Sequence, residues 1–159
     1  MFGAATFHAA MAEVVVGSMV LATLCAVGCA IAAIFPNIAG GRLSSERVMV
    51  TMDKASIAGA LLGLVFMPIA ALSGSFAADN VVNNALLYNK FVYTGLAFGF
   101  WASFVIGRVR LGPGVWQHRS LSVLQGATAA MAMLMTTMAS SIGGKLVRGE
   151  SIFDIMPVW

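Results

Sequence analysis

Apolar residues of this chain are gathered into four long stretches, and most polar residues fall between them. The stretches cover about residues 8–34, 55–76, 88–107 and 121–142. About 20 mostly apolar residues suffice for a helix to cross the roughly 30 Å hydrocarbon layer of a bilayer. The pattern predicts one all-α transmembrane domain over residues 1–159, an integral membrane four-helix bundle.

Two of the predicted helices end at recognisable stop signals. The first apolar stretch is followed by Phe35-Pro36-Asn37, where the proline cannot continue a helix. The fourth is followed by Gly143-Gly144-Lys145, a glycine stop with a cation after it. These signals predict where the first and the fourth helix end.

The composition supports the bilayer as the solvent of this chain. Hydrophobic residues make up 60% and charged residues 9%, and the mean hydropathy is +0.92. Soluble domains have about 45–50% apolar and about 25% charged residues, so a soluble fold could not cover its surface with so few charges. The net charge of +3 comes mainly from cations between the apolar stretches. The sequence contains no run of basic residues and no set of aromatic residues on which bases could stack, so nucleic-acid binding is not expected.

The positions of the cations predict an orientation, because cytoplasmic loops collect Lys and Arg. Six of the nine cations lie in or beside the first and third loops: Arg42, Arg47, Lys54, Arg108, Arg110 and Arg119. The other three are Lys90, Lys145 and Arg148. Loops one and three are predicted to be cytoplasmic, with both termini outside (N-out/C-out).

Small residues at four-residue spacing mark the predicted contact faces. Lipid is as apolar as leucine, so membrane helices associate through close backbone approach at such positions. The predicted helix-packing residues are Gly59, Gly63, Gly95, Gly99, Ser103, Gly107, Gly126 and Ala130. They indicate a tight bundle, or a bundle with one row of small residues left for a partner subunit.

The candidate chemistry lies near the start of the first helix. His8, Met11 and Glu13 could contribute to a copper or haem site. The alternative is an interfacial histidine without a ligand role and a carboxylate favoured by a helix N-terminus. The only other histidine, His118, is predicted at the opposite membrane surface, which excludes a haem held by both histidines of one chain.

Short motifs at three places resemble an uncharacterised prokaryotic family of four-helix integral membrane proteins. In that family a histidine opens helix one, A-A-L-x-G closes helix two, and G-G-x-L-V follows helix four. The corresponding residues here are Phe7-His8, Ala70-Ala71-Leu72-Ser73-Gly74 and Gly143-Gly144-Lys145-Leu146-Val147. The resemblance implies the same architecture, in a prokaryotic cytoplasmic membrane. The chain departs from it at Ala9, where the family has proline, and at Asn84 or Asn89, where the family often has a histidine. A redox centre held by those histidines would be lost here.

No motif for an enzymatic reaction is present, so three functions rank ahead of a membrane-embedded enzyme. The first is an accessory subunit of a larger membrane complex, of the energy-transducing or oxidoreductase kind, with bound lipids. The second is an electron carrier or metal-site protein that uses His8 and methionines to hold haem or copper. The third is a small transporter or channel, to which the scarcity of polar residues at mid-membrane is unfavourable. Association between copies of the chain is compatible with each.

Overall fold

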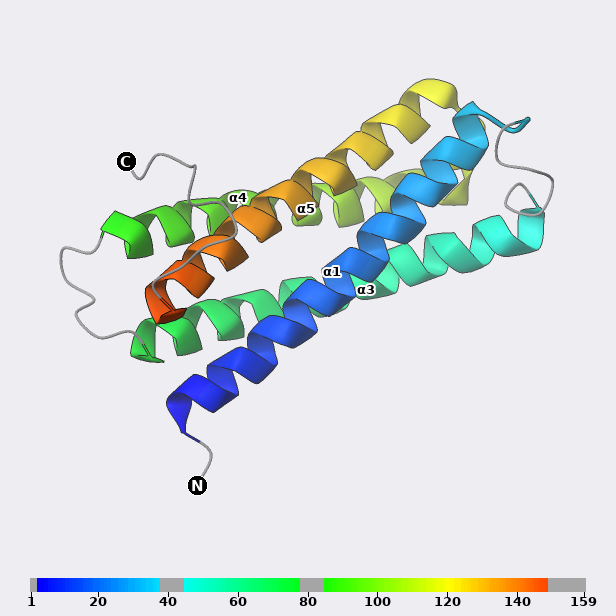
Figure 1. Ribbon diagram of the computed structural model, residues 1–159. Helices are drawn as coiled ribbons and strands as arrows, with labels where there is room; N and C mark the ends of the chain where they lie inside the picture. The colour runs from blue at the N-terminus through cyan, green and yellow to red at the C-terminus, as the bar shows by residue number, and fades with distance from the viewer. Residues whose placement is uncertain (1–2, 38–44, 78–84, 149–159) are drawn as a thin grey trace.

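The computed structural model describes residues 3–37, 45–77 and 85–148 and contains four long helices (Figure 1). They are α1 (Ala4–Ile34), α3 (Glu46–Ala77), α4 (Ala85–Leu111) and α5 (Arg119–Arg148), and a short 3-10 helix, η1 (Pro113–Gln117), precedes α5. All four long helices are long and apolar enough to cross a membrane. The predicted all-α four-helix bundle is therefore confirmed.

Each helix is longer than the apolar stretch that predicted it. The largest difference is in α3, which begins at Glu46 and runs without interruption through Pro68. Its first turns are helical because they pack on the end of α1: Met49 and Met52 lie against the core, and the Cys29 thiol donates to the Met49 carbonyl at 3.7 Å.

The helices alternate in direction along the chain, so the bundle has two distinct ends (Figure 1). One end, here called the loop end, contains the C-terminal turns of α1 and α4, the first turns of α3 and α5, and η1. The other, the cavity end, contains the opposite turns of the four helices. The closest pairs are α1 with α3 and α4 with α5, and α1 also lies along α5.

The core combines small residues with a few large side chains. On α1, Met19, Ala22 and Ala26 are fully buried. On α4, Trp101 and Phe104 are fully buried and meet edge to face, with ring centroids 5.8 Å apart. Small residues on α1 let its neighbours approach closely, and the two rings fill the wider space beside α4.

The outer surface of the helices is apolar as well. Leu24, Val65, Leu72 and Val109 are each more than half exposed. A helix that carries apolar residues on all sides is typical of a membrane span, because lipid covers the side that the protein does not. The exposed surface and the core together indicate an integral membrane protein.

Candidate functional site

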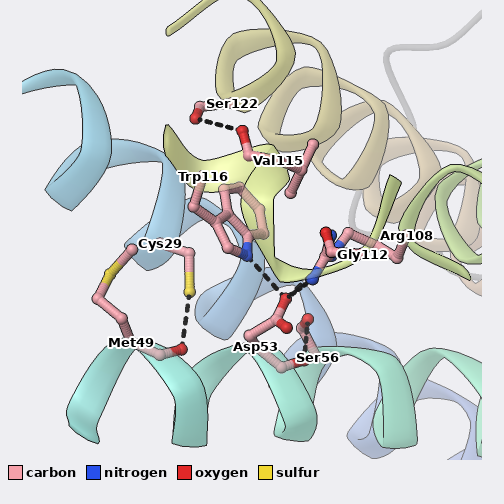
Figure 2. Close-up of polar contacts among 9 residues, drawn as sticks. All are labelled: Cys29, Met49, Asp53, Ser56, Arg108, Gly112, Val115, Trp116 and Ser122. Carbon is pink, nitrogen blue, oxygen red and sulfur yellow. Dashed lines mark hydrogen bonds and ion pairs between the residues drawn. The ribbon is translucent and has the colours of Figure 1, made fainter. Parts of the chain in front are cut away.

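A buried polar cluster joins three elements at the loop end (Figure 2). Asp53 of α3 accepts hydrogen bonds on one carboxylate oxygen, Oδ1, from Arg108 Nε at 2.9 Å, Arg108 Nη2 at 2.5 Å and Trp116 Nε1 at 2.7 Å. The side chain of Arg108 is 1% exposed and that of Asp53 is 10% exposed. Charged groups this deeply buried are stable only when paired and hydrogen-bonded, which this geometry provides.

The turn after α4 brings Trp116 to the carboxylate. Gly112 has φ +65°, a conformation open to glycine but strained for other residues, and Pro113 then starts η1. The carbonyl of Gly112 accepts a hydrogen bond from Arg108 Nη1. The guanidinium carbon of Arg108 lies 5.2 Å from the centroid of the Trp116 ring, within range of a cation–π interaction.

A serine hydroxyl attaches this turn to α5. Ser122 is fully buried, and its hydroxyl lies 3.2 Å from the Val115 carbonyl and 3.1 Å from the His118 carbonyl. The cluster therefore fastens α3, α4, η1 and the start of α5 to one another. Because Arg108 and Trp116 both donate N–H groups to the Asp53 carboxylate, and none of the three lines the cavity described below, we assign the cluster a structural role.

A cavity of about 350 Å³ lies at the cavity end, between all four helices. Its walls are mainly apolar and small: Ala9, Ala12, Val15 and Val16 of α1, Met67, Ala70 and Ala71 of α3, Ala97 of α4, and Ala139, Gly143 and Gly144 of α5. Side chains of this size leave part of the space between the four helices unfilled. Its volume falls in the range of about 300–1,000 Å³ that is typical of small-molecule sites.

A few polar side chains line the same cavity: His8, Lys90, Thr94, Thr136 and Ser140. The His8 ring is held against α3, with Nδ1 3.2 Å from Ser73 Oγ. The ring also lies on Gly74, where an added methyl group would be 2.7 Å from Cε1. Thr136 is fixed at the inner end of the cavity, since its hydroxyl accepts from Trp101 Nε1 at 3.3 Å and donates to the Ala132 carbonyl at 2.8 Å.

Lys90 lies on α4 and reaches across to α5. It is half-buried, and a methyl group placed on Gly143 would be 3.2 Å from its Nζ. Gly143 is near the C-terminal end of α5, where the helix dipole favours a cation. Within the described residues, no carboxylate is recorded at salt-bridge distance from the Lys90 ammonium group.

The predicted metal-binding residues are placed on different sides of α1. His8 faces α3 and the cavity, Met11 is half-buried and packs against the core, and Glu13 is exposed. His118 follows η1 at the loop end, whereas His8 lies in the first turns of α1, at the cavity end. In the ranges that the structure covers, no group of three or more His, Cys, Asp or Glu side chains could together hold a metal ion.

Four of the predicted packing glycines lie at close helix contacts, and three of them face α1. A methyl group on Gly59 would be 2.6 Å from the Ser18 carbonyl oxygen, and one on Gly63 would be 2.6 Å from Met19 Cε, both on α1. A methyl group on Gly126 of α5 would be 2.7 Å from the Ala30 side chain, also on α1. Glycine at these points allows α1 to approach both neighbours.

The row of small residues on α4 behaves differently. Gly107 lies against the Gln125 side chain of α5, but Gly95, Gly99 and Ser103 are exposed. Nothing within the described part of the chain comes within 4 Å of a methyl group placed on Gly95 or Gly99. Ala130 of α5 is exposed too. The exposed segment of the row, Gly95, Gly99 and Ser103, is called the α4 row below.

Sequence reasoning did not single out Asp53, Arg108, Trp116 or Lys90 as site residues. The apolar stretches place Asp53 just before the second predicted span, Arg108 just after the third, and Lys90 near the start of the third. The short Gly112-Pro113-Gly114 turn was a usable signal, because so few residues after a helix must turn the chain back on the helix end. For Lys90 the signal was a cation inside a predicted helix, which favours a functional reading.

Compared with known proteins, the chain matches no family model, no curated protein and no solved structure. The four-helix membrane architecture implied by the motifs at residues 7–8, 70–74 and 143–147 agrees with the observed fold, but no family is identified. Function must therefore be argued from the geometry of this chain.

Proposed function

We propose that this chain is a non-catalytic, accessory subunit of a larger membrane protein complex, and that the α4 row binds a transmembrane helix of a partner subunit. The observation that carries the proposal is the exposure of Gly95, Gly99 and Ser103 on a helix whose other side is packed. Small residues at four-residue spacing are common where membrane helices touch. Contact with lipid chains does not require small residues at this spacing.

The chain itself provides the comparison. Gly59, Gly63 and Gly126 have the same character as the glycines of the α4 row, and each is in close contact with another helix. The α4 row is the remaining surface of this kind with nothing against it in the part of the chain that the structure describes. A partner helix on the α4 row would pack as α1 packs on α3.

The partner test uses the tagged full-length chain, purified in mild detergent from the organism that encodes it. We expect native mass spectrometry to find a larger partner subunit with the wild-type chain. In the double variant Gly95→Ile, Gly99→Ile, partner recovery should fall about tenfold or more, since overpacking a contact costs about 1–3 kcal/mol and each 1.4 kcal/mol is about tenfold in affinity. The complex is proposed to be of the energy-transducing or oxidoreductase kind, and its absorption spectrum after recovery should therefore contain haem or flavin bands.

The matched control is Gly17→Ile, which changes an exposed glycine of α1 that also has nothing within 4 Å. This variant should retain the partner. Recovery of the wild-type chain only as a monomer, or only with copies of itself, would contradict the proposed subunit role. Retention of the partner by the double variant would contradict the α4 row as its binding surface.

The proposal includes the orientation with the loop end in the cytoplasm. Exposed cations support it: Arg47 and Lys54 of α3, Arg110 of α4 and Arg119 of α5 all lie at the loop end. Arg108 is also at this end but is neutralised by Asp53. Short loops rich in Lys and Arg stay on the cytoplasmic side.

Labelling of single added cysteines with a membrane-impermeant maleimide tests the orientation. Gly3→Cys should react in intact cells, whereas Gln117→Cys should react only after the membrane is permeabilised. Both positions are exposed and lie at opposite ends of the bundle. The wild-type chain, with Cys25 and Cys29 inside α1, measures the background. Labelling of Gln117→Cys alone in intact cells would reverse the orientation.

A further inference from the structure

We infer that the cavity at the cavity end binds an amphiphile with a negatively charged head and a hydrocarbon tail, with Lys90 paired to the head. This is a ligand site within one chain, and it does not depend on the proposed partner subunit. The observations behind it are the cavity itself, the charge that enters it and the chemistry of its walls.

The charge is the first step. Lys90 lies inside a helix that is apolar enough to span a membrane, it is half-buried, and no carboxylate of the described residues is recorded beside it. An ammonium group in such surroundings is unfavourable unless an anion accompanies it. At the loop end the same chain pairs its buried cation, Arg108, with Asp53. A ligand head can supply the corresponding anion at the cavity end.

The walls are the second step. Alanine, valine and glycine of α1, α3 and α5 line most of a cavity of about 350 Å³. Apolar walls with a small number of polar groups are typical of sites for apolar ligands, and the polar groups orient the ligand. The helices that line the cavity carry exposed apolar side chains at the same end, among them Phe7 of α1 and Leu72 of α3, and a hydrocarbon tail longer than the cavity can lie against them.

The third step is the polar contact beside the charge. His8 lines the same cavity and its ring is fixed by Ser73 and Gly74 of α3. Its imidazole adds a hydrogen-bonding group for oxygen atoms of the head. A carboxylate or a phosphate fits this combination, and it can come from a free fatty acid or from an anionic phospholipid of the bilayer.

Native mass spectrometry of the delipidated, full-length protein in a non-ionic detergent tests the inference. The probes are oleate, oleyl alcohol, which has the same tail without the charge, and a phosphatidylglycerol with oleoyl chains. We expect the protein to bind oleate or phosphatidylglycerol at least tenfold more tightly than oleyl alcohol. If phosphatidylglycerol binds more tightly than oleate, the source of the ligand is the bilayer; the reverse order favours a free fatty acid.

Three variants connect the binding to the cavity. Lys90→Met should weaken binding of the anionic probe at least tenfold and leave oleyl alcohol within threefold, whereas Lys90→Arg should keep the preference for the anion. Lys145→Met, which removes a lysine of α5 outside the cavity lining, should bind like wild type. Ala12→Phe, which fills the cavity, should abolish binding of all three probes, with helix content by circular dichroism confirming that it folds.

Equal binding of oleate, phosphatidylglycerol and oleyl alcohol would overturn the inference, as would an anion preference that survives in Lys90→Met. In either case the Lys90 ammonium extends to the membrane surface and does not bind a ligand. Loss of preference in Lys145→Met as well as in Lys90→Met would also overturn it, because a general attraction to this end of the protein would then explain the binding.

Discussion

Replacing Asp53 with alanine should lower the free energy of unfolding by about 3–5 kcal/mol, the range found when one partner of a buried ion pair is removed. The variant leaves the Arg108 guanidinium buried with neither of its bonds to Oδ1, and it removes the acceptor of the Trp116 N–H. Titration of the protein in mixed micelles with a denaturing detergent, followed by circular dichroism, measures the loss.

Glu46→Ala is the matched control, since Glu46 is an exposed acidic residue in the first turn of the same helix. Its loss should be about 1 kcal/mol or less, the contribution of an acidic side chain near a helix N-terminus. The double variant Asp53→Ala, Arg108→Met should be more stable than Asp53→Ala alone, because the unpaired buried charge is gone. The structural role of the pair would be contradicted if Asp53→Ala lost no more stability than Glu46→Ala. It would also be contradicted if the loss in the double variant equalled the sum of the losses in Asp53→Ala and Arg108→Met, each measured alone.

The four helices could be predicted from the sequence because each is determined by its own apolar residues. The hydrocarbon layer requires long apolar stretches, and the backbone within it must form its hydrogen bonds internally. The cluster of Asp53, Arg108 and Trp116 could not be predicted in this way. Asp53 and Arg108 are 55 positions apart, and their contact depends on how α3 and α4 meet and on the turn at Gly112.

Arg108 enters both the orientation argument and the buried ion pair. The count of Lys and Arg by loop includes Arg108 among the residues that set the orientation, while in the structure Arg108 is paired with Asp53. Sequence position alone cannot separate an arginine that faces water at a membrane surface from one that closes the end of a bundle. An acidic residue beside the arginine in space distinguishes the two cases, and here that residue is far away in the sequence.

Rows of small residues show a similar limit. The spacing on α3 and on α4 predicts close helix contact equally well, yet α3 places Gly59 and Gly63 against α1, while Gly95 and Gly99 of α4 are exposed. The spacing indicates that a helix can be approached closely, because no side chain stands in the way. It does not say whether the approaching helix belongs to the same chain.

Gly59 provides the second large effect. Gly59→Ala should lower the free energy of unfolding by about 1–3 kcal/mol, the usual range for overpacking. The added methyl group would be 2.6 Å from the Ser18 carbonyl oxygen and 3.2 Å from the Ala22 Cβ. The first of these atoms is backbone, so relief requires α1 to move away from α3 along their contact. The same denaturing-detergent titration measures the change.

The sign of the effect separates packing from helix propensity. Alanine favours a helix over glycine by up to about 1 kcal/mol, so propensity alone predicts that Gly59→Ala stabilises the protein. Gly17→Ala, at an exposed position of α1 with open space around it, should show that small gain or no change. If both substitutions stabilise the protein equally, α1 and α3 are not held in the close contact on which the bundle core depends. If only Gly59→Ala destabilises it, the contact between the two helices requires the absence of a side chain at this position.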